Sequence, residues 1–484
     1  MTICFFGCDY KYETEAVMKL FFPLTLFEFS YEEEAEGDRV VVRSDEGRLS
    51  VSVYTDGKTE ISEGTHEKAE AEGFTDEQAL CRMLYRILEG MTGVSPKWGC
   101  LTGIRPVKKV NALAAEGKSK EEIFAELNRR YYTSEEKLEL AYATAITQDK
   151  ALKRLSDNSY SLYISIPFCP TRCAYCSFVS HSIQSSGAKL IPGYTEKLCE
   201  EIALTAEMAE KKGLVLDTIY IGGGTPTAIS AENIEKIMKK VSECFDISSA
   251  AEYTVETGRA DTITEEKLRV IKEYGASRIS VNPQSMVDSV LEAAGRRHTA
   301  AQVEECFNMA RRLGFDNINM DVIAGLPTDT EEGFAYTIDK LIGLDPEDIT
   351  VHTLTVKRSA DLFARSDEVK KSISPSEVDR MVSYSCRRLM ESGYMPYYLY
   401  RQKNTVGNLE NVGYAKKGHE SLYNIYIMEE AQTILAAGAS GSTKLVNRAT
   451  GKINRHINYK YPYEYISRFD MMIDKKNTFM NENT

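Results

Sequence analysis

A repeated unit of strand, loop and helix fills the middle of the chain and restricts its fold more than any other feature. Each unit has a short apolar run, a loop with Gly or Pro, and an amphipathic helical pattern. The apolar runs lie at residues 161–167, 217–223, 252–258, 277–283, 317–325 and 348–356. Alternating strands and helices produce parallel strands. The six units therefore predict an α/β fold, either an open doubly wound sheet or a partial βα barrel, with ligands at the carboxyl ends of the strands.

Helix start signals fall between these runs. Ser230 is a predicted N-cap. Thr299 and Gln302 form a predicted capping box, and Asp329 and Glu332 form a second one. These signals place helices directly before amphipathic patterns, as the repeated unit requires.

Two regions of different character flank the repeats and divide the chain into 1–157, 158–358 and 359–484. Residues 1 to 65 are predicted to form short strands, including the N-terminal stretch to residue 29, and a helical pattern starts at the Thr75–Gln78 capping box. The first region is thus an α+β extension of unknown role. The last region combines a helix at 375–392 with the polar stretch 401–420, and is predicted to pack beside the sheet and contact substrate.

Composition narrows the functional classes. The 484 residues are 43% apolar and 27% charged, with a net charge of −13, which argues against a general nucleic-acid binder. No apolar run reaches the roughly 18 residues of a membrane span. The N-terminus lacks the basic start and long apolar stretch of a secretion signal, so a cytoplasmic protein is expected. Its 11 scattered cysteines are then reduced thiols.

Three of those cysteines are crowded into one loop. Cys169, Cys173 and Cys176 follow the first predicted strand with C-x₃-C-x₂-C spacing, in the stretch IPFCPTRCAYCSF. Three thiolates do not close a tetrahedral zinc site, although zinc with His181 as fourth ligand stays an alternative, as does a disulfide. A [4Fe–4S] cluster normally takes four protein ligands. Three would leave one iron open to a small chelating ligand.

The cysteine triplet, together with GGGTPT after the second strand, resembles the radical S-adenosylmethionine (SAM) superfamily. The resemblance implies that SAM chelates the open iron and is cleaved reductively to a 5′-deoxyadenosyl radical. It also implies a partial (β/α)6 barrel of the radical SAM type, here with an N-terminal α+β extension and a C-terminal α+β region.

Further motifs resemble the oxygen-independent coproporphyrinogen III dehydrogenase group. They are the stretch from Tyr163 to Cys169, the stretch from Gly222 to Thr227, and the single residues Glu256, Gln284, Arg296 and Asp321. The N-terminal extension and the segment RQKNTVGNLENVGYA are similar to the HemZ-like branch of this group.

The resemblance assigns a site residue by residue. It implies that Cys169, Cys173 and Cys176 hold the cluster, and that SAM is contacted by Tyr163, Tyr175, Gly222, Gly223, Gly224, Thr225, Glu256, Gln284, Arg296 and Asp321. The glycine carbonyls would accept from the SAM amino group. No catalytic side chain is assigned.

Five of these side chains have an expected partner on SAM. Arg296 would bind the methionyl carboxylate through its planar fork. Glu256 would take the methionyl amine or a ribose hydroxyl, and Gln284 and Asp321 would take ribose hydroxyls. Tyr175 would cover the adenine.

The activity implied is oxidative decarboxylation of coproporphyrinogen III to protoporphyrinogen IX, supplied with electrons by a donor such as flavodoxin or ferredoxin. This tetra-anionic tetrapyrrole needs cationic partners. The candidates are Arg297, Lys357, Arg358, Arg401 and Lys403.

Two departures from the group leave other functions open. Ser177 stands where the dehydrogenases have a fourth cysteine, and Ser165 where they have a histidine. A neighbouring branch contains haem chaperones with a histidine at the position of Tyr423, and His419 nearby keeps that function as an alternative. An iron–sulfur protein with a purely structural cluster is a third hypothesis.

Overall fold

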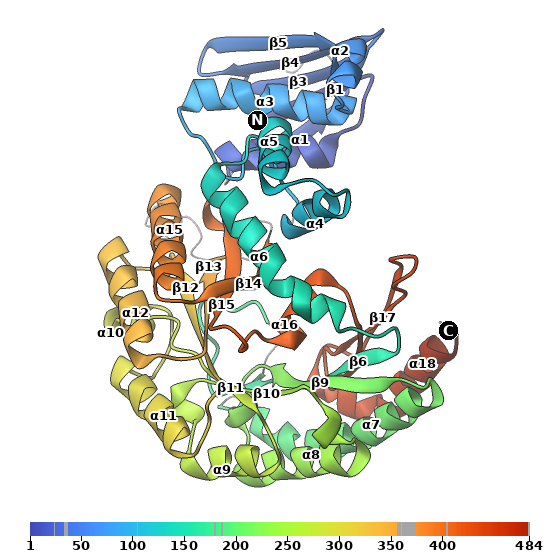
Figure 1. Ribbon diagram of the computed structural model, residues 1–484, viewed down its shortest axis with the longest axis vertical. Helices are drawn as coiled ribbons and strands as arrows, with labels where there is room; N and C mark the ends of the chain where they lie inside the picture. The colour runs from blue at the N-terminus through green and yellow to red at the C-terminus, as the bar shows by residue number, and fades with distance from the viewer. Residues whose placement is uncertain are drawn as a thin grey trace. The chain divides into compact units, whose positions relative to one another are not determined.

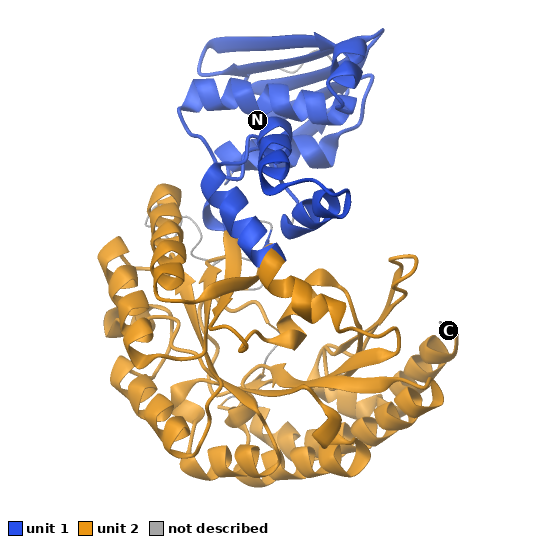
Figure 2. Cartoon of the chain, viewed as in Figure 1, with its two compact units in different colours: residues 1–145, 401–409 blue, residues 146–400, 410–484 orange. Residues whose placement is uncertain are grey.

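The chain forms two compact units (Figure 2). A computed structural model describes residues 1–23, 25–32, 37–103, 105–178, 181–184, 187–355, 360, 374–402 and 405–482. Unit 1 comprises residues 1–145 and 401–409, and unit 2 comprises residues 146–400 and 410–484. Within the described ranges, no helix has the length and apolar character needed to cross a membrane.

Unit 1 is built on a five-stranded sheet with the order β2-β1-β3-β4-β5. Its strands are β1 (Thr2–Phe6), β2 (Glu28–Ser30), β3 (Arg39–Asp45), β4 (Arg48–Thr55) and β5 (Lys58–Thr65). Strands β3, β4 and β5 are joined by two-residue turns at Glu46-Gly47 and Asp56-Gly57, where all four residues have positive φ. Paired positive φ angles are the geometry of tight hairpin turns, which explains the glycine in each.

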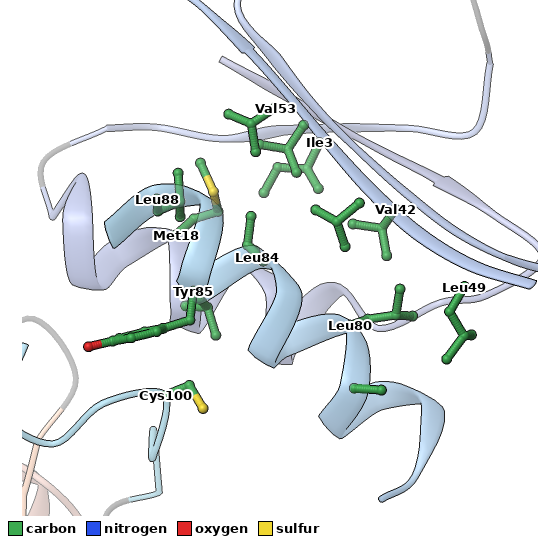
Figure 3. Packing of buried hydrophobic residues seen from close by; sticks show 14 of the residues in the cluster. Ile3, Met18, Val42, Leu49, Val53, Leu80, Leu84, Tyr85, Leu88 and Cys100 are labelled. Atoms are coloured by element: carbon green, nitrogen blue, oxygen red, sulfur yellow. The ribbon is translucent and has the colours of Figure 1, made fainter. Parts of the chain in front are cut away.

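Helices α1 (Lys11–Phe21), α2 (His66–Ala71) and α3 (Asp76–Thr92) pack on this sheet and enclose its core. They are followed by α4 (Val107–Ala115), α5 (Lys120–Tyr131) and α6 (Glu135–Lys153), the last of which continues into unit 2. Figure 3 shows Leu80, Leu84 and Leu88 of α3 facing Val42 and Val53 of the sheet. Their spacing of four residues places the leucines on one helix face, as the sequence pattern predicted.

The predicted strand over the N-terminal 29 residues is wrong in its middle. Only Thr2–Phe6 and Glu28–Ser30 are strands, and Lys11–Phe21 is a helix. Gly7, with φ +67° and no room for a Cβ beside the Ser44 carbonyl, ends β1. Thr14, Val17 and Met18 then lie at helical spacing and are buried. Burial of this face against α3 decides in favour of a helix, whereas the Thr75–Gln78 capping box is confirmed.

Unit 2 contains the six predicted parallel strands in chain order (Figure 1). They are β6 (Ser159–Ile166), β9 (Val215–Gly223), β10 (Glu252–Gly258), β11 (Arg278–Val281), β12 (Ile318–Ala324) and β13 (Asp348–Thr353). Five of them are buried over nearly their whole length, and β9 is buried at five of its nine residues. Such strands read as continuous apolar runs because helices cover the outside of the sheet.

The covering helices follow the strands along the outside of the curved sheet (Figure 1). They are α7 (Ile191–Lys211), α8 (Ala231–Cys244), α9 (Glu265–Glu273), α10 (Asp288–Ala293), α11 (Ala300–Arg312), α12 (Glu331–Leu344) and α15 (Pro375–Glu391). Ser230 and the Thr299–Gln302 box cap α8 and α11 as predicted. The Asp329–Glu332 box is wrong by one residue, because α12 begins at Glu331 and Thr330 accepts from the Gly333 N–H.

The C-terminal region extends the same sheet at both edges instead of packing as a separate layer. Next to β13 lie β15 (Glu410–Ala415) and β14 (Met395–Arg401), and next to β6 lie β16 (Thr433–Ala437), β17 (Ser442–Val446) and β18 (Ile453–Ile457). Helices α16 (Leu422–Glu429), α17 (Pro462–Ser467) and α18 (Phe469–Glu482) complete the unit. The eleven strands form an open, incomplete barrel, as expected for a partial βα barrel.

Candidate active site

The cysteine loop leaves the carboxyl end of β6. Cys169 and Cys173 are buried, and Cys176 is half-buried. Cys169 belongs to the short strand β7 (Phe168–Cys169), which pairs with β8 (His181–Ser182). The Cys176 N–H donates to the Cys173 carbonyl, a turn that links the backbone of the second and third candidate ligands. All three candidate ligands therefore lie where a parallel sheet binds ligands.

The glycine stretch at the end of β9 lies against this loop. The Gly224 N–H donates to the Ile166 carbonyl, and the Thr225 N–H donates to the Phe168 carbonyl. The Thr225 hydroxyl lies 3.6 Å from the Cys169 Sγ. A Cβ on Gly224 would come within 3.0 Å of that sulfur and 2.6 Å of the Phe168 carbonyl oxygen. Glycine is required here because the backbone passes so close to the first candidate ligand.

Glu256, near the end of β10, is the carboxylate nearest the glycines. A Cβ on Gly222 would approach the Glu256 Oε2 to 2.9 Å, and the Tyr220 hydroxyl donates to Oε1 over 2.5 Å. Burial raises the pKa of Glu256 from 4.5 to about 7, although the hydrogen bond from Tyr220 acts in the opposite direction. Cationic ligands are attracted to such a carboxylate, because they replace its lost solvation.

Three tyrosines stack beside Glu256. The Tyr220 ring lies 4.4 Å from the Tyr423 ring of α16, and Tyr163 of β6 stacks at 6.1 to 6.2 Å from both ring centres. The sequence analysis singled out Tyr163 and noted Tyr423 as a substitution, but it missed Tyr220. The aromatic residue two positions before Gly222 was the only available signal.

A backbone hydrogen bond joins Gln284, which follows β11, to Asp321 in the middle of β12. The Gln284 N–H donates to the Asp321 carbonyl over 2.9 Å. Gln284 has φ +69°, an unfavourable conformation for a residue with a Cβ. Its side-chain Oε1 is buried without a hydrogen-bond partner, and the residue is 7% exposed. A strained backbone holding an unsatisfied polar group is typical of a binding site.

Arg296 and Tyr175 form a pair. The Arg296 Nε donates to the Tyr175 hydroxyl over 3.1 Å, and its Nη1 donates to the Asn282 carbonyl over 2.7 Å. Asn282 in turn accepts from the Asp321 N–H through its side chain. The guanidinium is thus oriented by the cysteine loop and by the end of β11.

Arg259 is a further residue of the site that the sequence analysis missed. Its Nη1 lies 3.7 Å from the Cys173 Sγ and donates to Thr171, and its other side-chain nitrogens form a two-point ion pair with Asp261. It is 3% exposed. Hydrogen bonds to a cluster sulfur shift the reduction potential of an iron–sulfur centre. Its place three residues after Glu256 was the only signal in the sequence.

Two of the five candidate cations for a tetra-anionic substrate, Arg297 and Arg401, lie among the described residues. Lys357, Arg358 and Lys403 lie outside the described residues. Arg401 belongs to unit 1, where its guanidinium donates to the Asn408 and Leu101 carbonyls and lies over the Trp98 ring. Arg297 is exposed beside Arg296. Arg401 is therefore bound within unit 1, contrary to its prediction as a substrate contact.

The residues at the carboxyl ends of the strands fit a cluster with a chelating ligand better than the alternatives. All 11 cysteines are free thiols, which excludes the disulfide. Among the described residues, no three His, Cys, Asp or Glu side chains are grouped around a single metal ion, and this holds for the three cysteines as well, so it does not distinguish zinc from a cluster. The unpaired Gln284 Oε1 does distinguish them, because a closed zinc site holds no further ligand that would use this polar contact.

Comparison with known proteins places this geometry in a family. The model of the radical SAM superfamily matches residues 163–341. The chain is 41% identical to the oxygen-independent coproporphyrinogen-III oxidase-like protein HemZ of Bacillus subtilis, over 86% of this chain and 83% of that protein. It is 32% identical to the heme chaperone HemW of the same organism, over 61% of this chain and 75% of HemW. The chain therefore belongs to the radical SAM superfamily, within the group of oxygen-independent coproporphyrinogen III oxidase-like proteins.

A solved structure agrees on the fold. The coproporphyrinogen III oxidase HemN of Escherichia coli, a radical SAM enzyme, superposes with a TM-score of 0.52 at 22% identity, over 68% of this chain and 73% of HemN. The predicted family and the radical SAM type of partial barrel are thus confirmed. Members of this superfamily use a [4Fe–4S] cluster and SAM, which confirms the predicted cofactors.

Proposed function

We propose that the chain is an oxidoreductase that converts two propionate side chains of coproporphyrinogen III into vinyl groups, forming protoporphyrinogen IX in the cytoplasm. One arrangement carries the proposal: the cysteine loop, the glycine stretch, Glu256 and Gln284 meet at the carboxyl end of one sheet. The 41% identity to a coproporphyrinogen-III oxidase-like protein supports the choice of substrate.

In this proposal Cys169, Cys173 and Cys176 hold the cluster. Glu256 and the carbonyls of Gly222–Gly224 accept hydrogen bonds from the SAM amino group. Burial raises the pKa of Glu256, so binding of a cation in place of its proton is favoured. Arg296 offers its remaining donor to the methionyl carboxylate.

The far end of SAM has its own proposed contacts. Gln284 and Asp321 hold the ribose, and Tyr175 covers the adenine. Gln284 contributes the unpaired Oε1, which accepts a hydroxyl proton without breaking any existing bond. Tyr163 stacks on Tyr220 and so helps to fix the position of its ring. The Tyr220 hydroxyl in turn donates to Glu256.

The bound cofactors supply the one-electron chemistry that removes a hydrogen atom from the substrate. Each propionate then loses its carboxylate as CO₂ and passes one electron to an acceptor, which leaves a carbon–carbon double bond.

The haem chaperone is the second candidate, supported by the 32% identity to HemW. Two placements count against it. Tyr423 replaces the expected histidine and is packed within the tyrosine stack. The His419 carbonyl accepts from Arg278, the first residue of β11, so His419 is attached at the amino end of the sheet, opposite the cysteine loop.

An anaerobic assay separates the candidates. The reconstituted protein is given SAM, a reductant and coproporphyrinogen III, with Cys176→Ala as the matched control. We expect protoporphyrinogen and 5′-deoxyadenosine from the wild type and neither from the variant. Deoxyadenosine without protoporphyrinogen would refute the substrate, tight haem uptake without SAM cleavage would favour the chaperone, and an intact cluster that never binds SAM would favour the structural cluster.

A further inference from the structure

Exposed aromatic rings and basic side chains gather next to the cysteine loop. The ring of His181, on β8, packs edge-on against Tyr461 with 6.0 Å between ring centres, and Tyr461 stacks on Tyr463 at 5.6 Å. Tyr461 and Tyr463 are 37% and 52% exposed. Large aromatic rings left open to solvent at one place mark an interaction surface.

The same place is positively charged on an acidic protein. Lys460 lies 5.6 Å from the centre of the Tyr461 ring, and Arg468 lies 5.8 Å from that of Tyr459. Both cations are exposed. The segment from Ser442 to Lys476 carries eight lysines and arginines and three acidic residues, in a chain with a net charge of −13. Three of these cations add no charge to the surface here, because Lys476 is buried against Glu201 and Arg448 and Arg455 pair with Asp157 and Glu430. We define the aromatic–basic patch as His181, Tyr459, Lys460, Tyr461, Tyr463 and Arg468.

A short route joins the patch to the first candidate cluster ligand. The strand that carries His181 pairs with the strand that carries Cys169. The His181 N–H donates to the Pro167 carbonyl over 2.8 Å, and the Ile183 N–H donates to the Cys169 carbonyl over 2.9 Å. One hydrogen-bonded strand therefore separates the exposed rings from the backbone of a cysteine ligand. On the same loop, two residues after Cys176, Phe178 is 72% exposed.

We propose that the aromatic–basic patch is the docking surface for a small acidic one-electron carrier protein, which reduces the cluster through β8 and the Cys169 loop. The inference rests on the proposed cluster at Cys169, Cys173 and Cys176. The carrier loses one electron and the cluster gains one, so no bond breaks at the surface and no proton is required. The charge of the patch is opposite to that of the carrier, which favours fast encounter.

Two other partners would suit aromatic and basic side chains, namely single-stranded nucleic acid and an anionic membrane surface. Neither accounts for the place of the patch on the strand that pairs with Cys169. Electron transfer does, because its rate depends on a short path from the surface to the acceptor. The patch is therefore assigned to the carrier.

The test compares two kinds of reductant on the reconstituted holoprotein, namely protein donors and the small molecule dithionite. Stopped-flow absorbance follows cluster reduction by a flavodoxin hydroquinone, by a reduced ferredoxin and by dithionite. The test variant is Lys460→Glu/Arg468→Glu, and Lys211→Glu/Lys236→Glu, on α7 and α8, is a control with the same change in net charge. Tyr461→Ser tests the aromatic contact separately from charge.

We expect the Lys460→Glu/Arg468→Glu variant to lose about tenfold or more in second-order rate with at least one protein donor at low salt, and to show a flatter salt dependence. Dithionite should reduce it as fast as the wild type, and the control should retain nearly all its rate with both donors. Tyr461→Ser should slow the same protein donor at unchanged dithionite rate.

Several outcomes would overturn the inference. Protein-donor rates equal to those of the control would do so, and so would an equal loss with dithionite, because that loss would lie at the cluster and not in docking. Unchanged donor rates together with weakened binding to an oligonucleotide or to anionic vesicles would assign the patch to that partner. A wild type that holds no cluster reducible by dithionite would instead refute the proposed site itself.

Discussion

The two ends of the same six strands are built in different ways. At the amino ends, the first residues of β11 and β13, Arg278 and Asp348, form an ion pair that is 2% and 0% exposed. Tyr397 also donates to this carboxylate, and Arg278 donates further to Asn317 and to the His419 carbonyl. Glu252, which begins β10, accepts from the Ser421 hydroxyl and the Leu422 N–H. Most of these polar groups bind one another, although the second carboxylate oxygen of Asp348, Oδ1, is buried without a partner, and burial raises the pKa of Asp348 to about 7.

At the carboxyl ends, the polar groups are left ready for a ligand. Gln284 keeps an unpaired Oε1 on a strained backbone, and burial holds the pKa of Glu256 near 7. Both features cost stability in the cofactor-free protein. One end of this barrel is thus closed by an ion pair and its hydrogen bonds, whereas the other keeps an unpaired amide on a strained backbone, as expected where a βα barrel binds its ligand.

The largest effect is expected from breaking the amino end. Arg278→Met leaves the Asp348 carboxylate buried without its cation, which should lower the free energy of unfolding by about 3–5 kcal/mol. Chemical denaturation measures the loss. Arg269→Met removes an exposed arginine of α9 and should cost no more than about 0.5 kcal/mol. Equal losses in the two variants would mean that the amino end has no special role in stability.

Glu256 should make stability fall with rising pH in the cofactor-free protein. The folded chain binds this proton more tightly than the unfolded chain, so the stabilisation is complete below the ordinary pKa of 4.5 and is lost as pH rises to about 7. The loss is at most about 3 kcal/mol. Glu256→Gln keeps a hydrogen-bond acceptor for Tyr220 but cannot ionise.

Denaturation at about pH 4 and about pH 8 should therefore show a larger stability difference for the wild type than for Glu256→Gln, by up to that amount. Other titrating groups cancel between the two proteins. The same pH dependence in both would show that the pKa of this carboxyl is not raised in the folded protein.

Gly224→Ala tests how closely the glycine stretch approaches the cysteine loop. The new Cβ would lie 2.6 Å from the Phe168 carbonyl oxygen, so the loop must move. A cost of about 1–3 kcal/mol and a lower iron content after reconstitution are expected. Gly343→Ala, in helix α12 with no atom within 4 Å of the new Cβ, should instead stabilise by about 0.5–1 kcal/mol. Normal iron binding by Gly224→Ala would contradict the proposed position of the cluster.

Local signals in the sequence were enough for most of the barrel. The six strands were found because strands buried on both faces are apolar throughout, and Thr299–Gln302 because a capping box lies within one helical turn. The cysteine motif is equally local. The helix α1 was not predicted because apolar and polar residues alternate along its sequence, as they do in a strand. Its apolar helix face is revealed by its packing against α3.

The parts of the site that escaped prediction depend on contacts between distant residues. Arg259 reaches Cys173 across 86 positions, and the ring of Tyr423 reaches Tyr220 from a helix beyond the sixth strand. Arg401 follows the helix at 375–391 in sequence yet is bonded to Leu101 in unit 1. No pattern within a window of one strand or helix carries such pairings, so only the folded chain reveals them.

Gln284 gives the smallest and most selective test of the carboxyl end. Both Gln284→Ala and Gln284→Gly remove the amide, but only glycine relieves the cost of φ +69°. The glycine variant should therefore be more stable than the alanine variant by about 1 kcal/mol, whereas both should bind SAM about tenfold more weakly after reconstitution. Denaturation and equilibrium dialysis measure the two quantities. Because strain and ligand contact are separated in this pair, unchanged SAM affinity would remove Gln284 from the binding site even if the difference in stability is found.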